Sequence, residues 1–143
     1  MTIQQISIFL ENKSGQLSEI ADILAEHDID LRAIYIAETT DYAVLRIIAT
    51  KSQEASKVLL ERGFILSMTP VVAVEVPDKP GGLANLLDVL AGAECDLEYM
   101  YSVFGKKEGM AYMVLRVADI EKLEDILSKN GLNCVDGKQL GIE

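Results

Sequence analysis

The residue types best suited to chemistry in this sequence lie in a short polar segment that occurs twice. The two copies read Asn12-Lys13-Ser14-Gly15-Gln16-Leu17 and Asp78-Lys79-Pro80-Gly81-Gly82-Leu83. Glycine lets a ligand approach the backbone closely, and the N–H groups at the start of a helix attract a carboxylate. The Asn12 or Asp78 side chain, with nearby carbonyl groups, can accept hydrogen bonds from an ammonium group. Each segment is therefore a candidate site for a small zwitterion.

The same residue types also have a purely structural interpretation. Asp, Ser, Pro and Gly turn the chain and begin helices in many proteins, and the spacing alone does not separate the two interpretations. In either case we expect Ser14 to cap the first helix and Pro80 to lie in the first turn of its counterpart in the second half.

Other signs of catalysis are absent from the sequence. Its one histidine, His27, has no Cys or His partner at a metal-ligand spacing, and we expect it to cap a helix C-terminus. Cys95 and Cys134 lack the C-x-x-C spacing, and we expect both to pack as small apolar residues. The sequence has no nucleotide-binding glycine motif, serine-hydrolase motif or zinc-protease motif. We therefore predict a protein that is not an enzyme and that uses no metal or cofactor.

The charge balance argues against nucleic acid as a partner. The 143 residues include 13 Lys and Arg against 23 Asp and Glu, a net charge of −10, and no basic cluster exceeds the pair Lys106-Lys107. Nucleic acid backbones favour clustered cations. No run of about 18 apolar residues suggests a membrane span, and the N-terminus lacks the cationic start of a signal peptide. We expect a cytoplasmic protein with neither nucleic acid nor membrane as a partner.

The polar segments belong to a longer repeat that divides the chain in two. Residues 15–31 align with residues 81–97 at an offset of 66, and seven of the seventeen positions are identical. After a four-residue insertion, a Tyr-x-Val-Leu-Arg segment also matches. A period of about 70 residues is too long for a solenoid repeat and has the size of a small domain. We therefore predict a duplicated domain, with its copies over residues 1–69 and 70–143.

Within each copy the apolar spacing alternates between that of a strand and that of a helix. Alternate residues are apolar over 6–10 and 72–76, which predicts a first strand before each polar segment. The later predicted elements are strands over 31–37 and 97–104, strands that carry the Tyr-x-Val-Leu-Arg segments, helices that end at Gly63 and Gly131, and short strands over 64–68 and 132–140. The order βαββαβ in each copy predicts an α+β fold of two ferredoxin-like sandwiches in tandem.

One face of the predicted sheet is more apolar than a sheet face exposed to water normally is. If alternate residues of the third strand face the helices, Tyr42, Val44, Arg46 and Ile48 point away, joined by Phe9 from the neighbouring strand. The same set in the second half is Tyr112, Val114, Arg116 and Ala118. A sheet face left in water is normally more polar, although half-apolar surfaces are common. We expect this face to pack on another sheet in a homodimer.

The βαββαβ order, with D-x-P-G-x-L at the first turn, resembles the ACT domain, a small-molecule regulatory module of enzymes in amino-acid metabolism. The motif stands here as Asp78-Lys79-Pro80-Gly81-Gly82-Leu83, and the resemblance covers nearly the whole chain as two such domains. Residues 8–15 and 98–102 are similar to those of stand-alone tandem ACT proteins of bacteria.

This resemblance implies a ligand, usually an amino acid, held between paired ACT domains and regulating a metabolic enzyme. The first-turn loop of one domain would meet the second strand of its neighbour. By position, the loop residues are the twelve given above, and the strand residues are Tyr35, Ile36, Ala37, Tyr101, Ser102 and Val103. The first loop departs from the motif, because Asn12 replaces Asp and Ser14 replaces Pro. The two loops therefore need not bind the same ligand.

Two alternatives stay open from the sequence. The identical Tyr35 and Tyr101 are suited equally to a pocket wall and to core packing. The whole chain is also compatible with a scaffolding subunit of an enzyme complex that binds no ligand of its own.

Overall fold

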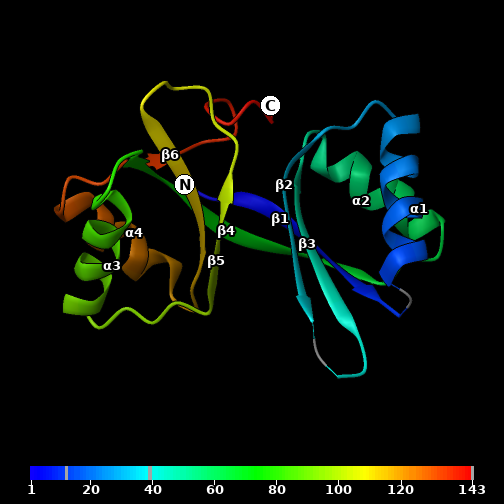
Figure 1. The fold of residues 1–143 in the computed structure, drawn as a ribbon, viewed down its shortest axis with the longest axis horizontal. Helices are drawn as coiled ribbons and strands as arrows, with labels where there is room; N and C mark the ends of the chain where they lie inside the picture. The colour runs from blue at the N-terminus through cyan, green and yellow to red at the C-terminus, as the bar shows by residue number, and fades with distance from the viewer. Residues whose placement is uncertain (12, 39, 143) are drawn as a thin grey trace. The chain divides into compact units, whose positions relative to one another are not determined.

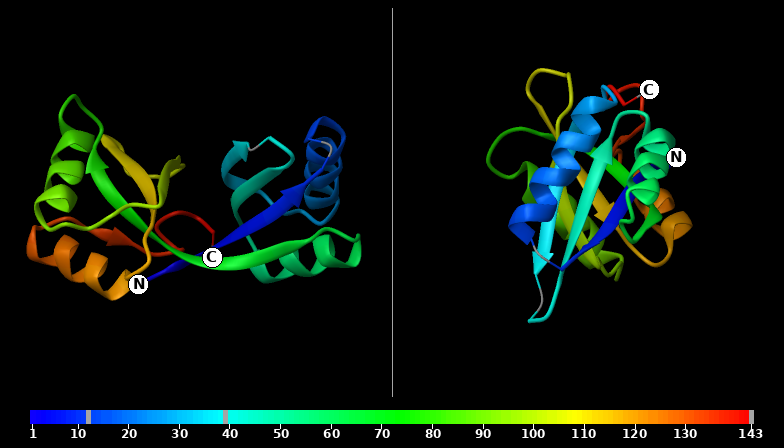
Figure 2. Two further views of the ribbon diagram at one scale, coloured as in Figure 1. Left: turned by 90° about the horizontal axis from the view of Figure 1, so that it is seen from below. Right: turned by 90° about the vertical axis from the view of Figure 1, so that its right-hand side faces the viewer.

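Strands and helices follow one another in the predicted order in a computed structural model that describes residues 1–11, 13–38 and 40–142. The elements of the first half are β1 (Ile3–Leu10), α1 (Lys13–Glu26), β2 (Leu31–Glu38), β3 (Ala43–Ala49) and α2 (Ser52–Glu61). They are followed by β4 (Leu66–Pro77), α3 (Gly82–Gly92), β5 (Tyr99–Val103), β6 (Met110–Arg116), α4 (Ile120–Lys129) and β7 (Cys134–Val135). Figures 1 and 2 show a pair of helices against one face of the sheet in each half. The predicted α+β fold of two ferredoxin-like sandwiches is confirmed.

The chain divides into two compact units. We call Gln4–Thr69 the first unit and Pro70–Gly141 the second, and the short N-terminal segment Met1–Ile3 groups with the second. Its terminal amine makes an ion pair with Glu124 on α4.

The core of the first unit forms where alternate strand residues meet the helices. In this unit β3 pairs antiparallel with both β1 and β2, and Leu45 lies opposite Ile8 on one side and Ile36 on the other. The helix-facing set is fully buried and comprises Ile6, Ile8, Leu10, Ala43, Leu45 and Ile47 from the strands, with Ile20, Ile23, Leu24, Ala55 and Leu59 from α1 and α2. Period-2 and helical spacing therefore identify this core correctly.

The second unit repeats the arrangement with β6 as the central strand. β6 pairs antiparallel with both β4 and β5, and β7 pairs with the other side of β4. The residues buried against α3 and α4 include Val72, Val74, Val76, Leu115, Val117, Leu86, Leu90, Leu123 and Leu127.

One strand, β4, replaces the two that the sequence analysis expects on either side of Thr69-Pro70. The strand runs from Leu66 to Pro77 without a linker. Proline lacks an N–H group and is tolerated in a strand only where that donor is not needed. The Pro70 carbonyl oxygen accepts a hydrogen bond from the Arg116 guanidinium at 3.0 Å. The β-branched run after Pro70 favours an extended chain.

The four helices in the described part of the chain end in the same backbone motif. Gly63 and Gly131 follow α2 and α4 with positive φ angles of 89° and 70°, as predicted. The equivalent residues after α1 and α3 are Asp28 and Glu94, with φ angles of 56° and 54°. Each motif is closed by a bond from the following N–H to a carbonyl in the last helical turn, such as Cys95 to Leu90 at 2.9 Å. Two of the four ends therefore hold a side chain in a conformation that favours glycine.

The predicted last strand over 132–140 is wrong beyond Val135. Asp136 and Gln139 exchange hydrogen bonds, because each backbone N–H donates to the other's side-chain oxygen, at 3.0 and 2.9 Å. This reciprocal pair closes a turn and ends β7 after two residues.

The expected open sheet face is only partly exposed. Phe9 and Tyr42 are 46% and 45% exposed, and their ring centroids lie 5.7 Å apart. Tyr112 and Val114, by contrast, are buried within the single chain, so the expectation that they face a second copy is wrong. The Tyr112 ring is covered by the loop at Gly105, where a Cβ would come within 2.1 Å of the ring.

Val114 is flanked by its neighbours across the strands, Ala73 and Tyr101, and Val44 is half-buried. Of the aromatic and valine residues expected on this apolar face, only Phe9 and Tyr42 are exposed enough to contact a second copy.

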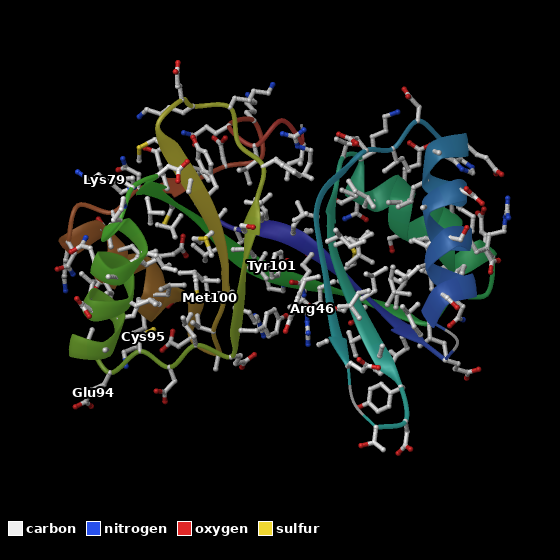
Figure 3. All side chains as sticks on the ribbon, in the orientation of Figure 1. Arg46, Lys79, Glu94, Cys95, Met100 and Tyr101 are labelled. Atoms are coloured by element: carbon white, nitrogen blue, oxygen red, sulfur yellow. The ribbon has the colours of Figure 1, made fainter. Side chains whose placement is uncertain are left out.

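The left-handed end of α3 generates a stability prediction. Glu94 extends away from the helix end in Figure 3, and its positive φ costs a non-glycine residue free energy. We expect Glu94→Gly to be more stable than Glu94→Ala by about 1 kcal/mol, because both remove the side chain and only glycine relaxes at this φ. Urea unfolding of the two variants measures the difference. Equal stabilities would show that this helix end stores no strain.

Candidate functional site

The second loop connects β4 to α3 and curls tightly through its backbone. The Asp78 N–H donates to the Gly109 carbonyl at 2.9 Å, which ties the loop to the turn between β5 and β6. The Lys79 N–H donates to the Pro77 carbonyl at 2.9 Å, and the Gly82 N–H donates to the Lys79 carbonyl at 3.0 Å. Asp78, Lys79 and Pro80 remain exposed. Figure 3 labels Lys79 on this loop.

Both glycines of this loop are required by its geometry. Gly81 has a φ of 92° at the N-cap of α3, and no side chain bonds to the helix there. A Cβ on Gly82 would lie 2.1 Å from the Pro77 carbonyl oxygen, a distance that no real side chain adopts. Pro80 lies outside α3, so its predicted place in the first turn is wrong. The left-handed Gly81 is the reason, because a helix cannot extend back through it.

The first loop is built differently. Asn12 and the side chain of Lys13 lie outside the described part of the structure. Because α1 begins at Lys13, Ser14 lies inside the helix and does not cap it, contrary to the prediction. Gly15 also lies in the first turn, and the Gln16 side chain accepts a hydrogen bond from the Glu11 N–H at 2.6 Å. Without the left-handed glycine of the second loop, the helix begins three residues earlier in the repeat.

Gln16 also lines a small pocket in the first unit. The pocket has a volume of about 200 Å³, and its other lining residues are Phe9, Glu11, Glu19, Arg62, Gly63, Phe64 and Ile65. Leu17 packs against the first core, whereas its repeat partner Leu83 is largely exposed. The repeat therefore preserves the apolar residue and changes its environment.

The candidate strand residues lie on β2 and β5, and antiparallel pairing places them near the loops. In the first unit Leu10 and Glu38 both lie opposite Ala43, so β1 and β2 end together. In the second unit Pro77 pairs with Met110 and Val103 with Tyr112, so β4 and β5 also end at one edge of the sheet. Each loop therefore shares one end of its sheet with its own candidate strand, one strand away.

The strand residues divide between the two faces of each sheet. Ile36 and Ser102 lie on the helix side, opposite Leu45 and Met113. Tyr35, Ala37, Tyr101 and Val103 lie on the other face by alternation. Met100 and Tyr101 point to opposite faces of β5 in Figure 3.

The two equivalent tyrosines occupy different environments. The Arg46 guanidinium lies 5.8 Å from the centre of the half-buried Tyr35 ring. Tyr101 is buried and stacks on Tyr99, with ring centroids 6.4 Å apart. Tyr101 is therefore covered within the chain, on the face of its sheet that points away from the helices.

The structure adds an apolar strip that the sequence analysis missed. Ile34 is 57% exposed and Ile36 is 37% exposed, although both lie on the helix side of β2, opposite buried Ile47 and Leu45. Among the described strands β2 pairs with β3 alone, as β5 pairs with β6 alone. Ile34 and Ile36 are two residues apart on one strand and therefore lie on the same face, so the sequence pattern could have predicted this apolar strip. An unpaired edge with exposed isoleucines favours contact with another chain.

The histidine and the two cysteines, which the sequence analysis considered for catalysis, have contacts that are explained by the fold. His27 donates from its ring nitrogen to the Ile23 carbonyl at 2.9 Å, the capping role expected of it. Burial raises the pKa of the Cys95 thiol and that of the Cys134 thiol above their ordinary values. Among the described residues no group of three or more His, Cys, Asp or Glu is placed to hold a metal ion. No helix in the described ranges is long and apolar enough to cross a bilayer.

Comparison with known proteins gives one family and several related folds. The family model of an ACT domain pair matches residues 1–142. Protein BT0572 from Bacteroides thetaiotaomicron is 36% identical, with a TM-score of 0.90 over 98% of this chain and 96% of that chain. No curated protein matches the chain significantly.

Two more distant structures share the fold at low identity. The ligand-free regulatory subunit of aspartate kinase from Thermus thermophilus is 18% identical over 90% of each chain, with a TM-score of 0.66. The corresponding subunit from Thermus flavus is 15% identical over 88% of this chain and 90% of that chain, with a TM-score of 0.58.

The tight approach at Gly82 generates a paired prediction. We expect Gly82→Ala to destabilise the protein by about 2 kcal/mol or more, because the new methyl group collides with a backbone oxygen. Gly92→Ala, at the other end of α3, meets no atom within 4 Å and should be neutral or stabilising by about 0.5 kcal/mol. Thermal unfolding of both variants tests this, and equal effects would contradict the role given to Gly82.

The buried thiols generate a pH prediction. Thiolate is the reactive form, and a raised pKa lowers its fraction at neutral pH. We expect alkylation of Cys95 and Cys134 at pH 7 to 8 to be slower in the folded protein than in the unfolded chain, because a smaller fraction of each thiol is thiolate. The protein unfolded in guanidinium serves as the control and should react at the ordinary rate. Fast alkylation of the folded protein at pH 7 would contradict the prediction.

Proposed function

The chain belongs to the family of ACT domain pairs, and on that premise we propose that it is a non-catalytic regulatory protein that binds a free amino acid. The ligand would lie between paired ACT domains, with the loop of one domain against the edge strand of its neighbour. Binding would favour one quaternary arrangement, and a separate metabolic enzyme would respond to it. The two Thermus proteins are named as regulatory subunits, which is the role proposed for this chain.

The observation that carries the proposal is the construction of the loop from Asp78 to Leu83. Gly81 and Gly82 allow a chain path that side chains would block, and α3 starts there with no side chain at its N-cap. The first-turn N–H groups of a helix attract a carboxylate. The exposed Asp78 carboxylate is suited to an ammonium group. An amino acid carries both groups at the spacing of one carbon atom.

The second loop is the better candidate of the two. In the first loop the Gln16 side chain already binds the Glu11 N–H, and the helix begins before Gly15. Neither the left-handed glycine nor the Asp of the motif is present there. We therefore assign the principal ligand contacts to the second loop.

The neighbouring domain is proposed to come from a second copy of the chain. β2 and β5 each leave one edge unpaired among the described strands, and β2 exposes Ile34 and Ile36 beside its edge. Pairing with another chain would extend the sheet and cover these isoleucines. In a homodimer formed at the edge strands, the loop that follows β4 in one copy would also lie close to an edge strand of the other copy.

A scaffolding subunit without a ligand is the second candidate. The exposed Phe9 and Tyr42 rings favour it, because paired aromatic residues are common in protein interfaces. The loop glycines would then serve the turn alone.

A thermal-shift screen against the twenty amino acids tests the proposed function. A ligand that binds only the folded state stabilises it by about 2.7 kcal/mol at a hundredfold excess over Kd. We expect one amino acid or one chemical group to raise the Tm of the wild-type protein, and gel filtration in its presence to show a homodimer.

A matched pair of variants locates the site. Asp78→Ala should abolish the ligand-induced rise in Tm while leaving the Tm without ligand nearly unchanged, because the side chain is exposed. Asp88→Ala changes an equally exposed carboxylate on the middle of α3 and should keep the full response. Flat traces for all twenty amino acids would favour the scaffolding candidate.

A further inference from the structure

The second unit contains a pocket that is basic within a strongly acidic chain. The pocket has a volume of about 340 Å³ and is lined by Glu75, Lys106, Lys107, Tyr112, Lys138 and Gln139. The whole chain carries a net charge of −10. We propose that this pocket binds a small dianionic metabolite, independently of the amino acid assigned to the loop.

The buried carboxylate of Glu75 organises the pocket. Glu75 is only 7% exposed, and a buried carboxylate is costly unless it is paired. Its Oε1 accepts a hydrogen bond from Lys107 Nζ at 3.2 Å, and its Oε2 accepts one from the Tyr112 hydroxyl at 3.4 Å. Both oxygens are therefore occupied, and the Lys107 ammonium group is held at the pocket wall.

Tyr112 keeps the pocket from gaining a second negative charge. Burial, and then the neighbouring Glu75 carboxylate, raise the pKa of Tyr112 above its ordinary value. The hydroxyl group therefore stays protonated at neutral pH and remains a donor to Glu75.

The charge of the pocket matches a dianion. Three lysine ammonium groups face one carboxylate, so two positive charges remain when Glu75 is counted. Among the described residues the ammonium groups of Lys106 and Lys138 form no ion pair or hydrogen bond, in contrast to that of Lys107. Lysine is a strongly hydrated point charge that suits phosphate and carboxylate oxygens alike.

The cationic groups come from segments far apart in the sequence that the fold fixes in place. Lys106 and Lys107 follow Gly105, which allows their loop to lie directly on the Tyr112 ring. Lys138 lies in the turn closed by Asp136 and Gln139, and the neighbouring Leu140 is fully buried. In Figure 1 the yellow loop between β5 and β6 and the red C-terminal segment lie at the same end of this unit.

The space in the pocket favours an organic anion over a bare ion. A volume of 340 Å³ exceeds what a phosphate ion needs and leaves room for a carbon skeleton beside the Tyr112 ring. Two kinds of metabolite offer the required dianion, phosphate monoesters and dicarboxylates. Their shared chemistry is a pair of negative charges on oxygen atoms.

Titration of the full-length protein with inorganic phosphate and, separately, with succinate tests the proposal. Isothermal calorimetry at low ionic strength should detect saturable binding of at least one of them. We expect the double variant Lys106→Gln/Lys138→Gln to weaken that binding by about tenfold or more, since each lost contact is a charge-assisted one. Tighter binding of phosphate assigns a phosphate monoester, and tighter binding of succinate assigns a dicarboxylate.

Two further variants separate a pocket from general charge attraction. Lys57→Gln removes an exposed lysine from α2 in the first unit and should leave the affinity unchanged. Glu75→Gln removes the negative charge while keeping the shape, so it should strengthen anion binding. Equal losses in the Lys57 and the Lys106/Lys138 variants, or no saturable binding of either anion, would overturn the proposal. Neither result depends on whether the loop binds an amino acid.

Discussion

The pairing of one central strand with two antiparallel neighbours is the constraint on which both candidate loops depend. Because β3 is antiparallel to β1 and β2, and β6 to β4 and β5, the outer strands of each trio run in the same direction and end together. The loop after β1 or β4 therefore emerges beside the end of an edge strand. In the second unit this geometry places the segment from Asp78 to Leu83 at the same end of the sheet as the end of β5.

The sequence predicts those parts of the fold that depend on local periodicity. Alternation identifies Leu45 and Ile47 as core residues because side chains along a strand point to its two faces in turn. One of these faces packs against the helices along its length. Gly63 and Gly131 mark helix ends because few other residues adopt a positive φ without cost. Asp28 and Glu94 adopt the same conformation with no sequence signal, and their carbonyl oxygens accept hydrogen bonds from the side chains of Lys51 and Lys122, which are distant in the sequence.

The parts that sequence reasoning predicts wrongly depend on contacts between distant segments. The burial of Tyr112 follows from a loop held over it by Gly105 and from Glu75, 37 residues away. The first strand of the second half merges with the preceding strand through Pro70, whose carbonyl oxygen accepts a hydrogen bond from Arg116, 46 residues away. The repeat also hides a difference between the loops. Gly81 precedes its helix with a positive φ, whereas its partner Gly15 lies inside one.

A net negative charge does not exclude a small anionic ligand, because the fold can gather lysines from separate segments. At −10 the chain repels polyanions as a whole, and the sequence contains no basic cluster larger than Lys106-Lys107. The fold adds Lys138 from 31 positions further along and neutralises one of the three lysines with a buried carboxylate. A long nucleic acid would meet the repulsive surface, whereas a small anion experiences mainly the field of its own pocket, because charges beyond about 10 Å are screened. A small dianionic ligand and an acidic protein are therefore compatible.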